Sequence, residues 1–114
     1  MVNKWDIWYC SLDPTQGSEQ RGTRPVLVVS NNAVNSALTV TTVLPFSSIK
    51  QGAHIYPTEV AISAVMSGLK VDSVVMVQQI RTIAQSRLTN RVSCLEDMTA
   101  RQEILLALKR YFEY

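Results

Sequence analysis

The hydrophobic pattern of this chain changes period once, and that change constrains the fold more than any other feature. From residue 4 to residue 95, apolar residues alternate with polar ones or form short runs bounded by turn residues, which is typical of β-strands. From residue 98 to residue 112, they recur every three or four positions, which indicates an amphipathic α-helix. Several short strands followed by one helix predict a mainly β protein, a small and strongly bent antiparallel barrel with a C-terminal helix against it.

Six stretches are predicted as strands, at residues 4–12, 25–30, 39–46, 58–63, 73–84 and 91–95. Asp97 is expected to cap the helix, because its carboxylate can accept a hydrogen bond from a free N–H of the first turn. The apolar stripe of the helix is expected to pack on the barrel. It consists of Ile104, Leu105, Leu108, Tyr111 and Phe112.

Length and charge limit the class of protein. The 114 residues, 46% hydrophobic and 18% charged, fit one domain spanning residues 1–114. No run approaches the roughly 18 apolar residues of a membrane span, and acidic residues interrupt the N-terminal region where a signal peptide needs an apolar segment. We therefore expect a cytoplasmic protein. A net charge of +2 announces no wide contact with duplex nucleic acid, so any such contact should be local.

Metal and triad chemistry have no support in the sequence. His54 is the one histidine, and no cysteine pair has metal-ligand spacing, so neither a zinc site nor a Ser-His-Asp triad is predicted. His54 either titrates in a mobile loop or is a solvated bystander. Cys10 and Cys94 are expected to be reduced thiols.

A charged loop precedes the second strand. Residues 17–25, G-S-E-Q-R-G-T-R-P, carry two guanidinium groups, a carboxylate and an amide between two glycines and a proline. The loop is either a site for an anionic ligand or a solvated hairpin loop whose charges confer solubility.

Polar residues also interrupt the fifth predicted strand. Alternation would place Gln79 and Arg81 on one face and Gln78 on the other. Two adjacent amides in a β core are unusual, and they either form cross-strand hydrogen bonds at a solvated edge or belong to a site. Ser47, at the end of the third strand, is by itself explained as turn chemistry.

Five motifs, in order along nearly the whole chain, resemble the MazF/PemK (Kid) toxins. They are D-I-W-Y…L-D-P at residues 6–14, G-S-E-Q-R-G-T-R-P-V-L-V-V-S-N at 17–31, P-F-S-S at 45–48, P-T-E-V at 57–60, and D-S-V-V-M-V-Q-Q-I-R-T…S-R-L at 72–88. The resemblance implies the CcdB/Kid/MazF-like toxin fold, an SH3-like small β-barrel with a C-terminal helix that forms a homodimer.

The resemblance also implies a function. These toxins of type II toxin-antitoxin systems are sequence-selective endoribonucleases that need no metal or cofactor. They cleave single-stranded RNA by attack of the 2′-hydroxyl, leaving a 2′,3′-cyclic phosphate and a 5′-hydroxyl. The implied partners are the RNA substrate and a cognate acidic antitoxin, with DNA contacted only through the antitoxin, and no membrane.

The family motifs place its catalytic arginine on Arg24 and its catalytic hydroxyl, usually a threonine, on Ser47. An acidic position that some members use falls on Gln78. Serine keeps the hydroxyl and loses the methyl group that stiffens χ1, so activity should tolerate it. Glutamine cannot accept a proton as a carboxylate does, so a general base at that position is not available.

Glu19 either takes the proton of the 2′-hydroxyl or holds Arg21 and Arg24 in place. Stacking of an unpaired base on Trp8 or Phe46 is a weaker hypothesis, since both rings can belong to the core. The full set of expected RNA-binding residues is Gln20, Arg21, Thr23, Phe46, Gln78, Gln79 and Arg81.

Two alternatives remain at this point. A toxin of the same fold class that binds DNA gyrase would be an inhibitor and not a nuclease, although the loop at residues 18–25 favours the nuclease. A catalytically inactive RNA-binding relative would differ from the active family at positions such as Ser47 and Gln78.

Overall fold

The structure is a computed structural model that describes residues 1–19 and 22–113. Strands dominate the chain up to residue 94, and a long helix follows. The elements are β1 (Asp6–Ser11), β2 (Thr23–Val28), α1 (Asn32–Ala37), β3 (Val40–Ser48), β4 (Glu59–Ile62), α2 (Ala64–Ser67), β5 (Ser73–Met76), the 3-10 turn η1 (Val77–Gln79), β6 (Arg81–Ala84), the 3-10 turn η2 (Gln85–Arg87), β7 (Leu88–Cys94) and α3 (Met98–Phe112).

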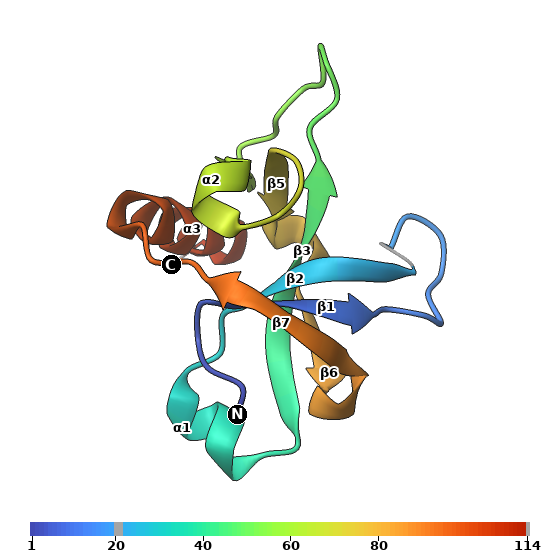
Figure 1. The fold of residues 1–114 in the computed structure, drawn as a ribbon. Helices are drawn as coiled ribbons and strands as arrows, with labels where there is room; N and C mark the ends of the chain where they lie inside the picture. The colour runs from blue at the N-terminus through green and yellow to red at the C-terminus, as the bar shows by residue number, and fades with distance from the viewer. Residues whose placement is uncertain (20–21, 114) are drawn as a thin grey trace.

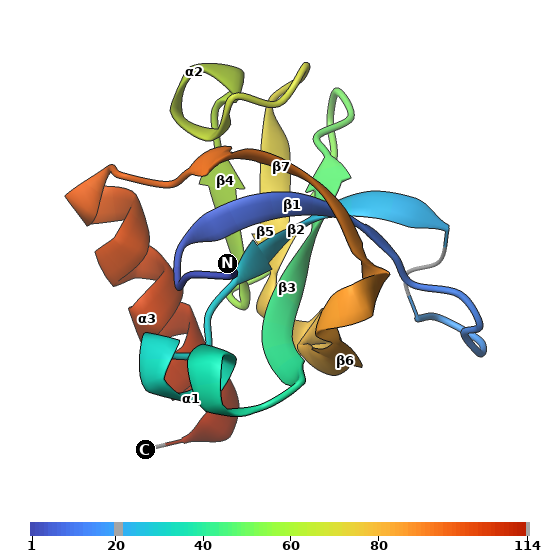
Figure 2. The same ribbon diagram turned by 60° about the horizontal axis from the view of Figure 1, so that its bottom comes forward.

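The strands form one bent antiparallel sheet in the order β4-β5-β3-β2-β1-β7, with β6 paired to β3. β3 is the central strand: it pairs with β2 on one edge, and with β6 and then β5 on the other. β3 is nine residues long, so it pairs with strands in both halves of the sheet, and the two halves curve around it (Figures 1 and 2). The expected mainly β barrel with a C-terminal helix is confirmed.

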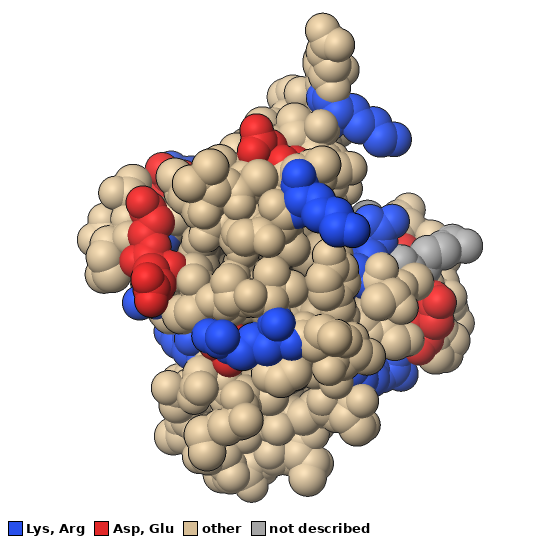
Figure 3. Space-filling view, in the orientation of Figure 1, with Lys and Arg blue, Asp and Glu red and all other residues tan. Residues whose placement is uncertain are grey.

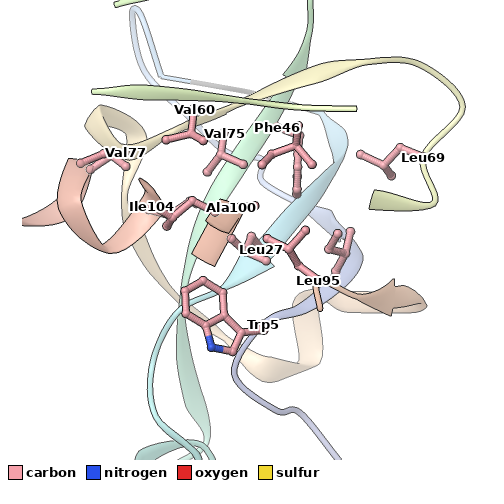
Figure 4. Close-up of a cluster of buried hydrophobic side chains, with 14 residues drawn as sticks. Trp5, Leu27, Phe46, Val60, Leu69, Val75, Val77, Leu95, Ala100 and Ile104 are labelled. Carbon is pink, nitrogen blue, oxygen red and sulfur yellow. The ribbon is translucent and has the colours of Figure 1, made fainter. Parts of the chain in front are cut away.

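The main core lies between the sheet and α3. Trp5, Leu27, Phe46 and Ile104 meet there from the N-terminal segment, β2, β3 and the helix (Figure 4). A second cluster, which includes Cys10, packs on the other face of β1, β2 and β3. The alternation of β2 supplies both clusters, since Leu27 faces the first and its two neighbours face the second.

Helix α3 has the predicted start and a different buried face. Asp97 caps it, and its Oδ1 accepts a hydrogen bond from the Ala100 N–H at 2.8 Å. The buried residues are Ala100, Ile104 and Ala107: the two small alanines let the helix lie close to the sheet, and Ile104 packs into the core. The stripe prediction is thus wrong for three of its members, which are exposed: Leu105, Tyr111 and Phe112.

The predicted strand at residues 73–84 is two strands separated by the turn η1. The turn is closed by a hydrogen bond from the Ile80 N–H to the Val77 carbonyl at 3.0 Å. Because alternation does not continue through a 3-10 turn, the predicted division of Gln78, Gln79 and Arg81 between two faces does not apply. The turn carries both glutamine amides at the junction of β5 and β6.

Two short helices were not predicted. Asn31 caps α1 and Ser63 caps α2, each by accepting a hydrogen bond from the N–H three residues on. Gly68 ends α2 in the left-handed conformation with φ of 76°. Helices of six and four residues are too short to show a helical period, so their caps are their only sequence signal. Within the described residues, no helix has the length and hydropathy needed to cross a membrane.

Candidate active site

Two hollows open beside the end of β3. The larger has a volume of about 520 Å³ and is walled by β1, β2, β3 and the segment between α2 and β5. The smaller, of about 160 Å³, lies where the loop before β2 meets η1. Arg24 lines the larger hollow, and Glu19 lines the smaller one.

Arg24 is half-buried on β2, across from Cys10 in the ladder with β1. The pairing of β2 with β3 ends at Val26 and Pro45, two residues short of Arg24 on β2 and of Ser47 on β3. The ladder with β1 holds the backbone at Arg24, which limits the positions of its guanidinium.

The two serines at the end of β3 differ in position. Ser47 is half-buried, whereas Ser48 is exposed and lines the larger hollow together with Arg24. Neither hydroxyl has a hydrogen-bond partner within residues 1–19 and 22–113, so both are available to a ligand. Sequence reasoning singled out Ser47 and missed Ser48, whose signal was only its place in the P-F-S-S motif.

The smaller hollow brings together four of the residues expected from the sequence: Glu19, Gln78, Gln79 and Arg81. They come from the loop before β2, from η1 and from the start of β6. Positions about 60 residues apart therefore form one wall, as the resemblance implied that they should.

Side chains from the β5–β7 region hold that loop by its backbone. Arg81 donates a hydrogen bond to the Leu12 carbonyl at 2.6 Å, and Gln79 donates one to the Ser18 carbonyl at 3.1 Å. Arg87 donates to the Asp13 carbonyl at 2.6 Å. These contacts assign Arg81 and Gln79 a positioning role that the sequence had not suggested, and they add Arg87 to the site's support.

Gln78 is tied to the start of β4. Its Oε1 accepts a hydrogen bond from the Thr58 hydroxyl at 3.0 Å, and its Nε2 donates one to Glu59 Oε2 at 2.7 Å. The other oxygen of Glu59 accepts from the Tyr56 N–H at 3.1 Å. A carboxylate therefore adjoins the position at which some relatives are acidic, although it belongs to the P-T-E-V motif and not to the long strand.

The remaining expected site residues are placed as follows. Phe46 is 1% exposed and packs in the core while it also lines the larger hollow, and its stacking on a base stays a prediction. Thr23 is exposed on β2 and lines the larger hollow. Gln20 and Arg21 lie outside the described residues. Glu19 accepts a hydrogen bond from the Gln16 N–H, a contact that shapes the loop.

The loop between β3 and β4 projects from the body of the molecule (Figure 1). It carries His54, whose ring meets the Tyr56 ring edge-on with centroids 4.5 Å apart. No three His, Cys, Asp or Glu side chains of residues 1–19 and 22–113 gather as ligands for a metal ion.

Charge is distributed unevenly around the two hollows. Figure 3 shows Lys and Arg side chains over β7, β2 and the base of the projecting loop, with most visible acidic side chains nearer the edges of that view.

Burial raises the pKa of the Cys10 thiol above its ordinary value, and the positive charges of Arg87 and Arg81 oppose this rise. This thiol therefore stays protonated at neutral pH and is no nucleophile.

Comparison with known proteins agrees with this geometry. The model of a family described as PemK-like, MazF-like toxin of type II toxin-antitoxin system matches residues 3–112. Endoribonuclease EndoA of Bacillus subtilis (strain 168) is 39% identical over 97 residues, covering 85% of this chain and 83% of the relative. Endoribonuclease MazF9 of Mycobacterium tuberculosis (strain ATCC 25618 / H37Rv) is 41% identical over 104 residues, covering 84% and 86%.

The fold is likewise similar to a solved structure, that of an endoribonuclease in complex with its cognate antitoxin from Mycobacterial species. The TM-score is 0.78 at 20% identity, with 99% of this chain and 96% of that chain covered. At that identity the likeness concerns the fold alone.

Proposed function

Because the chain belongs to the family of PemK-like, MazF-like toxins of type II toxin-antitoxin systems, we propose that it is a sequence-selective endoribonuclease that cleaves single-stranded RNA without a metal ion. Two relatives at about 40% identity that are named endoribonucleases support this activity over gyrase binding or an inactive relative. The observation that carries the proposal is Arg24, fixed on β2 in the ladder with β1 and lining the larger hollow together with Ser48.

The proposed reaction is an intramolecular displacement at phosphorus. The 2′-oxygen forms a bond to the adjacent phosphorus, the bond from phosphorus to the 5′-oxygen breaks, and the proton of the 2′-hydroxyl is lost while the 5′-oxygen gains one. Since nucleophile and target are in one molecule, the protein needs only to align them and to stabilise the crowded anionic transition state. The products are a 2′,3′-cyclic phosphate and a 5′-hydroxyl.

Arg24 is the residue suited to that stabilisation. A guanidinium donates two parallel hydrogen bonds to two phosphate oxygens, and a serine hydroxyl adds a third donor. Arg24 acts electrostatically in this proposal, because a guanidinium holds its proton tightly and is a poor proton acceptor. We assign the third donor to Ser47, the position to which the family motif points, two residues beyond Pro45 on β3.

The smaller hollow guides the RNA strand toward this centre. Gln79 and Arg81 hold the loop in shape, and the remaining donors of the loop and of η1 contact the RNA. Among the described residues that line the two hollows, Glu19 is the one carboxylate. Its hydrogen bond from Gln16 supports a role in holding the loop and not in accepting the proton.

Partners and location form part of the same proposal. The chain is one domain that acts in the cytoplasm as a homodimer, and its regulator is a small acidic antitoxin. A disordered acidic segment of that antitoxin would fold across the cationic hollow and exclude RNA. Contact with DNA would occur only through the antitoxin.

The experiment is cleavage of a long, unstructured RNA in EDTA, with cut positions mapped by primer extension. We expect cuts at a short recurrent sequence, products with 5′-hydroxyl and cyclic phosphate ends, and no cleavage when the nucleotide before the cut carries a 2′-deoxyribose. A matched duplex is expected to resist. Cleavage of the deoxy-substituted strand, or equal cleavage of the duplex, would overturn the proposal.

A further inference from the structure

We propose that Lys70 is a second phosphate-binding cation of the larger hollow, so that the hollow holds the nucleotide next to the scissile bond with its phosphate on the Lys70 ammonium. The proposal rests on the function proposed above, because it assumes that the scissile phosphate lies at Arg24. It deepens that function by assigning a binding residue that no family motif of the sequence contains.

The size and lining of the larger hollow suit a nucleotide. Its volume of about 520 Å³ is in the range of pockets that enclose small ligands, roughly 300 to 1,000 Å³. The described residues of its lining include two cations, Arg24 and Lys70, and no carboxylate. Apolar surface from Tyr9, Pro25 and Leu69 completes it. A flat apolar base linked to an anionic phosphate matches these walls.

Hydrogen bonds hold the backbone on both sides of Lys70. The preceding residue, Leu69, is 8% exposed in the core, and its N–H donates a hydrogen bond to the Ser67 hydroxyl at 3.0 Å. Two residues beyond Lys70, the Asp72 carboxylate accepts a hydrogen bond from the Ala64 N–H at 2.8 Å, and its carbonyl accepts one from the Ile49 N–H at 3.1 Å. The backbone at Lys70 is therefore held on both sides while its side chain is exposed.

The positive charge of Lys70 is not neutralised by a neighbouring acid in the described part of the chain. Within residues 1–19 and 22–113, the ammonium of Lys70 has no ion-pair partner, and the nearest acid in sequence, Asp72, is engaged with α2. By contrast, Arg91 is paired with the buried Asp6 at 3.3 Å. The Tyr9 hydroxyl, in the same hollow, likewise has no hydrogen-bond partner in the described part of the chain. Both groups are therefore available to an anionic ligand.

The two cations suit different tasks. The guanidinium of Arg24 fits the geometry of the reacting phosphate, whereas an ammonium on a flexible stem attracts a phosphate as a point charge. A contact that is equally strong in the ground state and the transition state lowers KM and leaves kcat unchanged. Loss of Lys70 should therefore weaken RNA binding and spare the chemical step.

The test compares Lys70→Gln with Lys109→Gln, which removes the same charge from an exposed position on α3. The probe is a single-stranded oligonucleotide built on a mapped cut site, with 2′-deoxyribose at the cleaved nucleotide so that it binds without reacting. Its Kd is measured over a series of salt concentrations. The all-ribose oligonucleotide gives kcat and KM, and circular dichroism with thermal melting checks that each variant is folded.

We expect Lys70→Gln to raise Kd and KM roughly fivefold to tenfold at low salt with kcat within about twofold. The slope of log Kd against log salt should fall by about 0.7, the value for one phosphate contact in a single strand. Lys70→Arg should restore binding, and Lys109→Gln should match the wild type.

The inference is overturned if the wild type binds and cleaves the RNA while Lys70→Gln keeps the wild-type slope. A wild type that neither binds nor cleaves would instead refute the proposed function. A fall in kcat with Kd unchanged would also overturn the inference, because it would place Lys70 in the chemical step.

Discussion

At the scale of single residues, Arg24 gains its chemical position from the ladder between β1 and β2, which fixes its backbone. Its side chain lines a hollow whose described lining includes a second cation, Lys70, and no carboxylate. A hollow with this lining attracts an anionic ligand. The hydroxyls beside it then decide how well the transition state is held.

Substitutions distinguish the catalytic roles of the Ser47 and Ser48 hydroxyls. We expect Ser47→Ala to lower kcat about 100-fold, the effect of losing one preorganised donor, and Ser47→Thr to keep the rate. Ser48→Ala is the matched control and should change kcat less than about threefold. Single-turnover cleavage of the mapped oligonucleotide measures all three, and the reverse order of the two alanine variants would move the catalytic role to Ser48.

Glu19 is tested by removing its charge while keeping its oxygen. Glu19→Gln can still accept the hydrogen bond from the Gln16 N–H, so we expect kcat within about threefold of the wild type and an unchanged pH profile. Glu19→Ala cannot, and its KM should rise because the loop loses a contact. A loss of more than about 100-fold in Glu19→Gln, with a flattened acid limb, would identify Glu19 as the general base.

Residue-level prediction from sequence worked where the signal is local. An acidic residue just before the helical period predicted the cap at Asp97, which is confirmed. The motif that points to Arg24 is local in the same way, and the role of Arg24 stays a prediction. No local pattern marks Lys70, because its place in the hollow with Arg24 depends on the turn after α2 returning to β2. Phe46 was expected either to stack on a base or to belong to the core, and it is 1% exposed because burial of its large apolar ring is favourable.

At the scale of elements, the loop before β2 is held by side chains that come late in the chain. Arg81, Arg87 and Gln79 donate hydrogen bonds to its backbone carbonyls, so β6 and the two 3-10 turns set its shape. A hydrogen bond from a charged donor contributes about 1.5 to 3 kcal/mol, and less where solvent reaches it. The loop is therefore coupled to these turns and does not move independently of them.

Arg87→Ala tests this coupling. It removes the hydrogen bonds to Ser11 and Asp13 without touching either hollow, so we expect KM to rise several-fold and the loop to be cleaved faster by trypsin. Mass spectrometry of the fragments locates the cleavage. Arg110→Ala, on α3, is the matched control, and equal proteolysis of the two variants would contradict the coupling.

The elements themselves were largely predictable, with informative exceptions. Alternation and the change of period gave the positions of most strands and of the long helix, because burial of one face imposes those periods. The turn η1 was missed because its residues are flanked by apolar runs that read as one strand. The helices α1 and α2 were missed because a single turn or two cannot establish a period.

At the scale of the whole molecule, α3 exposes apolar side chains that the barrel does not cover. Leu105, Leu106 and Phe112 are 45%, 46% and 52% exposed, on the helix whose buried face is formed by Ala100, Ile104 and Ala107. An apolar patch of this kind on a small protein is typical of a surface covered by a partner. We assign it to the homodimer of the proposed function.

The dimer prediction is tested with Leu105→Asp/Leu106→Asp. Burying a carboxylate against the partner's apolar surface is costly, so we expect the double variant to elute as a monomer of half the mass in light scattering. Asn90→Asp, an exposed position on β7 and not on α3, is the control and should stay dimeric. A monomeric wild type, or a double variant that remains dimeric, would contradict the assignment.

The central claim is that Arg24 stabilises the transition state of a metal-independent RNA cleavage. The most direct measurement is the single-turnover rate constant on the mapped oligonucleotide in EDTA for the wild type, Arg24→Lys and Arg24→Ala. The account predicts a fast wild type, a loss of about 100-fold or more in Arg24→Ala, and only partial recovery in Arg24→Lys, because an ammonium cannot donate two parallel hydrogen bonds. Near-wild-type rates in both variants would contradict it.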